Sequence, residues 1–256
     1  MRRDPDQQHH SLRSAPEGDA GLIALCVGAF LYQMTLSDPA AEAFLNPYAL
    51  VPARFTDDGW AAAHGLSRAD LVPFLSSMFL HGGIMHIVSN LWVLWVFGPA
   101  LEDRLGSGRF LLLYFVSGLA AGLLHLAFNF SSTVPALGAS GAIAGIIAAY
   151  ARRFPYAWVN ILQPIVIVPV FFFMPALVFA GLWFLTQIMQ ATGSLALPGA
   201  GGVAWWAHIG GFLAGWLLLP RMAPPANAAE DARAAAQSAL WPWTVWTRWL
   251  TWWWRR

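Results

Sequence analysis

The sequence contains no lysine and a single cysteine, Cys26, and only 11% of its 256 residues carry a charge. One cysteine excludes an internal disulfide and a cysteine-based metal framework, so Cys26 is expected to fill space in an apolar helix. The net charge of +1 gives no reason to expect a nucleic-acid partner. A soluble domain carries about 25% charged residues, so the low charge content points toward a membrane.

The charges that are present leave long gaps. None occurs at residues 110–151 or 154–220, and 58% of the chain is hydrophobic. Because a membrane helix needs about 20 apolar residues, the pattern predicts an all-α, polytopic membrane protein with a bundle of six transmembrane helices. The expected spans are residues 21–37, 71–98, 110–130, 138–153, 174–190 and 203–219, and the membrane part of the second is expected to start near His81.

The predicted domain organisation has three parts. Residues 1–19 are expected to be a disordered tail and residues 20–222 the membrane domain. Residues 223–256 form a C-terminal tail whose Trp- and Arg-rich end either anchors in the headgroup layer or binds a partner. The first apolar run is a retained helix or, alternatively, a signal peptide cut near residues 41–43. The remaining connections are loops at 37–70, 129–137 and 192–202, a charged turn at 102–109 and a proline-interrupted, non-helical stretch at 155–174.

Arginines alternate along the chain with loops that have few or none. They lie near residues 2–13, 104–109, 152–153 and 221. The positive-inside rule therefore predicts that both termini are cytoplasmic. The expected location is the cell membrane, with a bacterial inner membrane favoured.

Three short motifs place polar side chains in these spans. They are Gly138-Ala139-Ser140-Gly141, Ala207-His208-Ile209-Gly210-Gly211, and His81 followed by His86 and Asn90. Polar groups in a membrane are costly and mark function. At a rise of 1.5 Å per residue, the serine, His208, His86 and Asn90 all fall in the outer leaflet.

Small residues predict how the serine and the histidine meet. Gly141 and Gly145 are four residues apart, as are Gly211 and Gly215, and such pairs let two helix backbones approach closely. Close packing would bring His208 to the Ser140 hydroxyl as general base to nucleophile. Glycine packing alone, with Ser140 as a helix N-cap, is the alternative.

The start of the fourth span also suits an anion. Unpaired amides of Ser140 and Ala139 at a helix N-terminus would face an oxyanion, and His86 and Asn90 could add side-chain donors. A plain helix–helix hydrogen bond is the alternative for Asn90. His81 is expected to hold the loop or line a water path. No acidic residue lies near His208, so packing or water must set its tautomer.

At these residues the chain resembles the rhomboid family of intramembrane serine proteases, over roughly residues 21–221. The motifs are His81–Asn90, Glu102–Gly108, Gly138–Gly141 and Ala207–Gly211. The resemblance implies six helices around a water-filled cavity open to the outside and a Ser140–His208 dyad. It also implies an oxyanion site with His86 and Asn90, and hydrolysis of peptide bonds in or near transmembrane segments of membrane-protein substrates. The bilayer is the expected surrounding, and no cofactor or metal is expected.

The chain departs from some members of that family in two places. A Trp-Arg pair of the first loop is missing, since Trp60 and Arg68 are separated, and Ala144 stands where an aromatic residue stacks on the histidine. Three alternatives remain. They are a catalytically silent membrane-protein binder, a zinc site made of His81, His86 and His208, and a transporter, which lacks charged midplane residues and inverted repeats.

Overall fold

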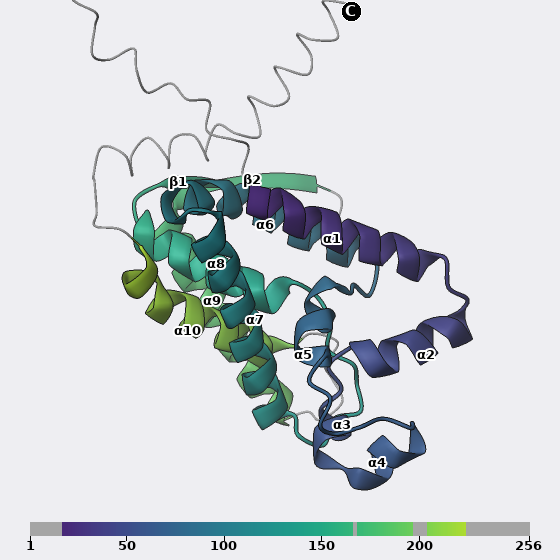
Figure 1. The fold of residues 1–256 in the computed structure, drawn as a ribbon. Helices are drawn as coiled ribbons and strands as arrows, with labels where there is room; N and C mark the ends of the chain where they lie inside the picture. Colours follow the sequence, from purple (N-terminus) through teal and green to yellow (C-terminus); the bar gives the residue numbers. More distant parts are fainter. Residues whose placement is uncertain (1–16, 166–167, 197–203, 224–256) are drawn as a thin grey trace, which may run out of the picture.

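Six long helices form the body of the part of the chain that the structure describes (Figure 1). A computed structural model describes residues 17–165, 168–196 and 204–223. The long helices are α1 (Glu17–Met34), α6 (Ile84–Leu105), α7 (Ser107–Phe128), α8 (Ser140–Arg153), α9 (Ala176–Ala196) and α10 (Trp205–Met222). Each falls where the sequence predicts a span. Within the described residues, three segments are long and apolar enough to cross a membrane: Ile84–Leu105, Ser107–Phe128 and Ala176–Ser194.

Helix α8 is the centre of the bundle, and every residue from Gly141 to Ala151 is buried. A β-carbon added to Gly211 would overlap the carbonyl oxygen of Gly141, and one added to Gly215 would overlap Gly145. The predicted backbone-to-backbone contact between these two glycine pairs is therefore confirmed. A side chain at Gly211 or Gly215 would therefore require the two helices to separate.

The predicted charged turn at residues 102–109 is wrong. Helix α6 continues to Leu105, and only Gly106, with φ of +80°, separates it from α7. Glu102 is not solvated in a turn: it lies within α6, is 2% exposed, and accepts hydrogen bonds from the backbone amides of Gly18 and Asp19, both at 2.8 Å. These bonds satisfy the open first turn of α1. That helix begins at Glu17, so the predicted tail of residues 1–19 ends too late, and residues 1–16 lie outside the described residues.

The segment predicted as a loop at residues 37–70 contains short helices, and so does the start of residues 71–98, ahead of α6, which begins at Ile84 close to the expected membrane boundary near His81. The short elements are α2 (Asp38–Tyr48), α3 (Pro52–Thr56), α4 (Asp58–Ala63), α5 (Pro73–Ser76) and the 3₁₀ turn η2 (Ser77–Phe79). Proline stands in the first turn of α2, α3 and α5, where its missing N–H costs nothing. Helices α3 and α4 lie at the end of the bundle opposite the start of α1 (Figure 1).

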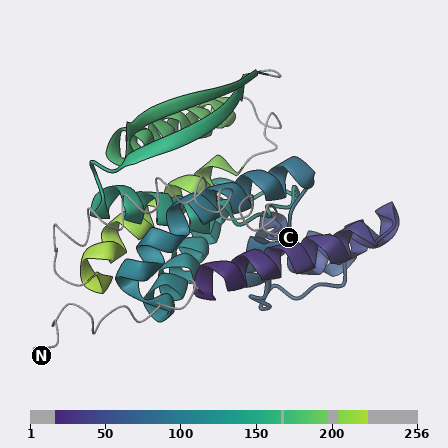
Figure 2. The ribbon, with the colours of Figure 1, turned by 90° about the horizontal axis from the view of Figure 1, so that it is seen from above.

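The proline-interrupted stretch is non-helical, as predicted, but it forms an antiparallel hairpin that the sequence analysis did not predict. Strand β1 (Trp158–Ile165) pairs with β2 (Val168–Pro175). Figure 2 shows the hairpin along one side of the helices, away from α1. Helix α9 then extends to Ala196, so the loop predicted from residue 192 is wrong in its first part. Residues 197–203 and the Trp-rich tail at 224–256 lie outside the described residues.

Candidate active site

Ser140 and His208 meet between α8 and α10. The Ser140 Oγ lies 2.8 Å from the His208 Nε2, a hydrogen-bonding distance, and His208 is 8% exposed. The contact joins residues 68 positions apart in the chain. The Ser140–His208 contact follows from the glycine packing. Ala207 and Gly211, on either side of His208 in α10, lie against Gly141, the residue after Ser140.

Aromatic rings hold the His208 imidazole in place. The Trp183 ring of α9 lies 5.7 Å from it, and the Trp205 ring of α10 meets it edge-on at 6.0 Å. Position 144 in α8, an alanine, is fully buried and supplies no ring. The aromatic support missing from α8 therefore comes from other helices, which the sequence analysis did not foresee.

Ser140 is the first residue of α8, so the amides around it have no partner within the helix. Gly138, just before it, has φ of +120°, and its own amide donates to the Ser77 carbonyl at 2.8 Å. A β-carbon on Gly138 would lie 2.7 Å from the His86 Nε2. Only glycine allows this backbone and this approach together.

His86 and Asn90 lie beside Gly138, one turn apart on α6. The Gly82 amide donates to the His86 Nδ1 at 3.3 Å, so a neutral His86 ring carries its proton on Nε2, the atom nearest Gly138. The Asn90 Nδ2 donates to the His86 carbonyl at 3.0 Å. That bond uses one of the two amide protons of Asn90.

The other histidines differ in setting. His81 is 2% exposed, and its backbone forms two hydrogen bonds with the Gln33 side chain of α1, at 3.0 and 3.2 Å. His125 of α7 lines a pocket that also reaches Ser140 and Gly138. Among the residues that the structure describes, no three His, Cys, Asp or Glu side chains gather as metal ligands. The structure thus lends no support to the zinc alternative.

The loop before Ser140 is held by the segment between α1 and α6. Leu50 and Ala136 pair through two backbone hydrogen bonds of 2.9 Å, and the Ala53 amide donates to the Ser132 carbonyl, also at 2.9 Å. Ala136 is four residues from the serine. The position of α3 and the strand-like residues before it therefore fixes the approach to α8.

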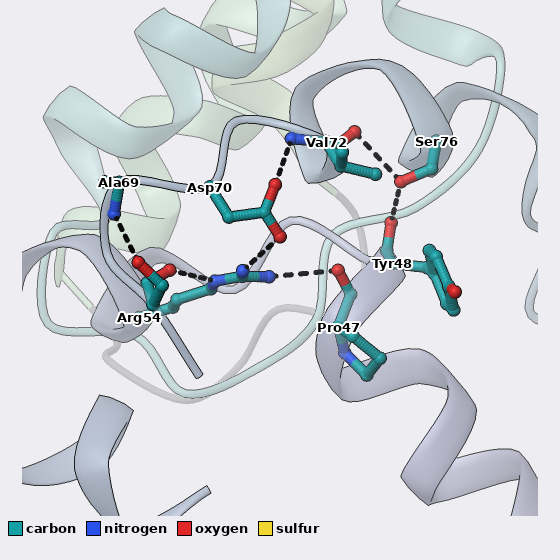
Figure 3. A network of polar contacts seen from close by, with 8 residues as sticks. Pro47, Tyr48, Arg54, Ala69, Asp70, Val72 and Ser76 are labelled. Carbon is teal, nitrogen blue, oxygen red and sulfur yellow. Dashed lines mark hydrogen bonds and ion pairs between the residues drawn. The ribbon is translucent and has the colours of Figure 1, made fainter. Parts of the chain in front are cut away.

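A buried arginine in turn fixes α3 (Figure 3). Arg54 is 1% exposed and donates to the Asp70 carboxylate at 2.7 Å and to the Pro47 and Ser67 carbonyls at 2.9 and 3.1 Å. The amide of Val72 and the Arg54 guanidinium, both donating to Asp70, hold the pKa of that carboxyl below its ordinary value. This network anchors the first loop in place of a Trp-Arg pair, and it was missed because no spacing rule links Arg54 to Asp70.

One further side chain at the dyad was also missed. Gln187 of α9 is 4% exposed, and its Oε1 lies 2.7 Å from the His208 Nδ1. A glutamine within an apolar span is a signal that could have been noticed, because polar side chains there need a partner.

Fold and site together define a class of protein, in which apolar membrane helices hold a serine hydrogen-bonded to a histidine. The rhomboid-domain profile matches residues 68–224, which is more than half of the chain. This chain belongs to the rhomboid family.

Several curated proteins are similar to this chain. Presenilin-associated rhomboid-like protein A, mitochondrial, of Danio rerio is 31% identical over 69% of this chain and 41% of its own length. Rhomboid protease GluP of Bacillus subtilis is 43% identical over 29% of this chain and 14% of its own length. RHOMBOID-like protein 4 of Arabidopsis thaliana is 26% identical over 81% of this chain and 46% of its own length. The chain spans less than half the length of each of these relatives.

Proposed function

We propose that this protein is an intramembrane serine endopeptidase that hydrolyses peptide bonds in or near transmembrane segments of membrane proteins. The observation that carries the proposal is the 2.8 Å contact between the Ser140 Oγ and the His208 Nε2 at the start of a buried helix. Membership of the rhomboid family, with a relative named as a protease, supports it. No cofactor is needed for this chemistry.

Ser140 is the proposed nucleophile and His208 the general base and acid. His208 takes the hydroxyl proton as the oxygen attacks the scissile carbonyl, and it returns that proton to the leaving amine. The resulting acyl-enzyme is hydrolysed by a water that His208 activates in the same way. The charge that develops on the carbonyl oxygen meets the amides of Ala139 and Ser140, the His86 Nε2 proton and the free proton of the Asn90 amide. Gly138 leaves room for the His86 ring beside it, Gly141 lets α10 pack closely against α8, and His81 has a supporting role in the loop.

The proposed membrane domain comprises residues 20–222 with six spans. Helix α8, with 14 residues, is short for a span at about 1.5 Å per residue. Its buried surface explains how it can be short, since other helices rather than lipid surround it. The Arg-bearing helix ends are placed in the cytoplasm and the dyad toward the outside. The relatives include both mitochondrial and bacterial proteins, so a bacterial inner membrane stays a prediction.

Labelling with a fluorescent fluorophosphonate tests the proposed dyad. Purified protein in detergent is compared with Ser140→Ala and His208→Ala, and a fusion carrying a transmembrane segment is offered as substrate to all three. We expect the wild type to be labelled and to cut the fusion, and both variants to do neither. A folded wild-type protein that is not labelled would favour the silent membrane-protein binder. Labelling that survives Ser140→Ala would mean that another residue is the nucleophile.

A further inference from the structure

Gln187 presents its carbonyl oxygen, not its amino group, to His208. The Thr186 Oγ1 donates its only proton to the Trp183 carbonyl at 2.6 Å, so toward Gln187 it acts as an acceptor. The Gln187 Nε2 lies 3.0 Å from that hydroxyl oxygen and 3.2 Å from the Trp183 carbonyl. Both neighbours accept, so the amino group must face them, and the Oε1 faces the His208 Nδ1 at 2.7 Å.

An acceptor at Nδ1 decides where the neutral imidazole carries its proton. The Nδ1 must donate to the Gln187 Oε1, which leaves the Nε2 lone pair free to accept the Ser140 hydroxyl at 2.8 Å. Without Gln187, the ring could carry its proton on Nε2, where it would face Ser140 and could not act as a base. The sequence offers no acidic residue for this task anywhere at residues 154–220.

We infer that Gln187 is a positioning residue that fixes the base tautomer of His208. The inference rests on the proposed role of His208. Because a neutral amide oxygen takes the place of a carboxylate, the Nδ1 proton is held without a charge in the apolar interior, where an unpaired charge would be costly. The bond also ties the dyad to α9, a helix that contributes none of the sequence motifs.

The test compares fluorophosphonate labelling rates over a pH series for the full chain and three variants. Gln187→Met keeps the length of the side chain but removes the acceptor. Gln187→Glu keeps an acceptor and adds charge. Gln190→Met is the matched control, because Gln190 is exposed on the same helix. Thermal unfolding in detergent confirms that each variant is folded.

We expect Gln187→Met to lower the labelling rate about tenfold or more, and Gln190→Met to leave it unchanged. Gln187→Glu should keep labelling but move the acid limb of the pH profile to higher pH, since a carboxylate favours the protonated ring. His86 and His125, the other titratable groups acting on His208, are the same in every variant. If Gln187 had only a structural role, Gln187→Glu would not shift the acid limb of the pH profile.

The possible failures are distinguishable. If the wild type and Gln190→Met are not labelled, the proposed protease function fails. If both are labelled and Gln187→Met reacts as fast as they do, the positioning role is wrong. If Gln187→Met does not fold, Gln187→Glu decides alone, and an unshifted pH profile overturns the inference.

Discussion

At the scale of single residues, Gly138 combines a left-handed backbone conformation with a close side-chain neighbour. Its φ of +120° is unfavourable for any other residue, and a β-carbon would press on the His86 ring at 2.7 Å. Strain of about 1–3 kcal/mol is expected, enough for a tenfold or greater loss of rate if it falls on the reacting geometry. We therefore predict that Gly138→Ala lowers fluorophosphonate labelling of Ser140 at least about tenfold.

Gly83 supplies the matched control for this prediction. It lies on the same side of the site at the start of α6, its φ of 163° is extended backbone, and nothing lies within 4 Å of an added β-carbon. Gly83→Ala should be labelled like the wild type. Equal labelling of Gly138→Ala would show that the loop can yield without disturbing the serine.

Asp70 should make the stability of the protein depend on pH in the acidic range. Its pKa is lowered in the folded state by the Val72 amide and by Arg54, relative to an unfolded value of about 3.9. The stabilisation from the charged Asp70 carboxylate is therefore complete above its unfolded pKa. It is lost as the pH falls through its lower folded pKa. We predict that Asp70→Asn lowers the melting temperature at pH 7, and that its difference from the wild type shrinks at an acidic pH near the lowered folded pKa of Asp70.

Glu42→Gln serves as the comparison, since Glu42 is exposed on α2 and outside this network. It should melt like the wild type at both pH values. An Asp70→Asn protein as stable as the wild type at pH 7 would show that the Arg54 network contributes nothing.

At the scale of helices, the contact between α8 and α10 leaves no space for side chains. A β-carbon on Gly211 would overlap backbone atoms of Gly141, so the two helices would have to separate. We predict that Gly211→Ala lowers the free energy of unfolding by about 3 kcal/mol or more and abolishes labelling, because His208 moves with its helix. Thermal unfolding and labelling measure the two effects.

Gly181 provides the opposite case within α9. Nothing lies within 4 Å of a β-carbon added there. Gly181→Ala should be neutral or stabilising by about 0.5–1 kcal/mol, because alanine has the better helix propensity. If both substitutions proved harmless, the close packing of α8 on α10 would not be what holds the dyad together.

These elements also show which features a sequence can reveal. Apolar length located the six helices, and glycine spacing predicted the contact that joins Ser140 to His208. The hairpin was not predicted because prolines signal only where a helix cannot continue. Gln187 and Arg54 were missed because their partners come from other elements, and such pairings depend on tertiary packing.

At the scale of the whole molecule, three helices are arranged alike. His86, Ser140 and His208 lie in the first turns of α6, α8 and α10, whereas Arg104, Arg152 and Arg221 lie in their last turns. Hydrogen bonds join the helix ends that carry arginines. Arg109 donates to the Met222 carbonyl at 3.1 Å, and Arg152 donates to the Trp216 carbonyl at 2.7 Å. The candidate site therefore lies at the first turns of these three helices and arginines lie at their last turns, whereas Arg54 in the first loop is paired with Asp70.

This polarity predicts which ends of α7 a reagent can reach from each side of the membrane. In a Cys26→Ser background, a single cysteine is placed at Thr133, exposed after the end of α7, or at Gly108, exposed near its start. With a membrane-impermeant maleimide on intact cells, Thr133→Cys should react at once and Gly108→Cys only after permeabilisation, because positive ends stay inside. The reverse pattern would invert the orientation and place the dyad toward the cytoplasm. Equal reaction at both sites would mean that α7 does not cross the membrane, and this result would contradict the six-span arrangement.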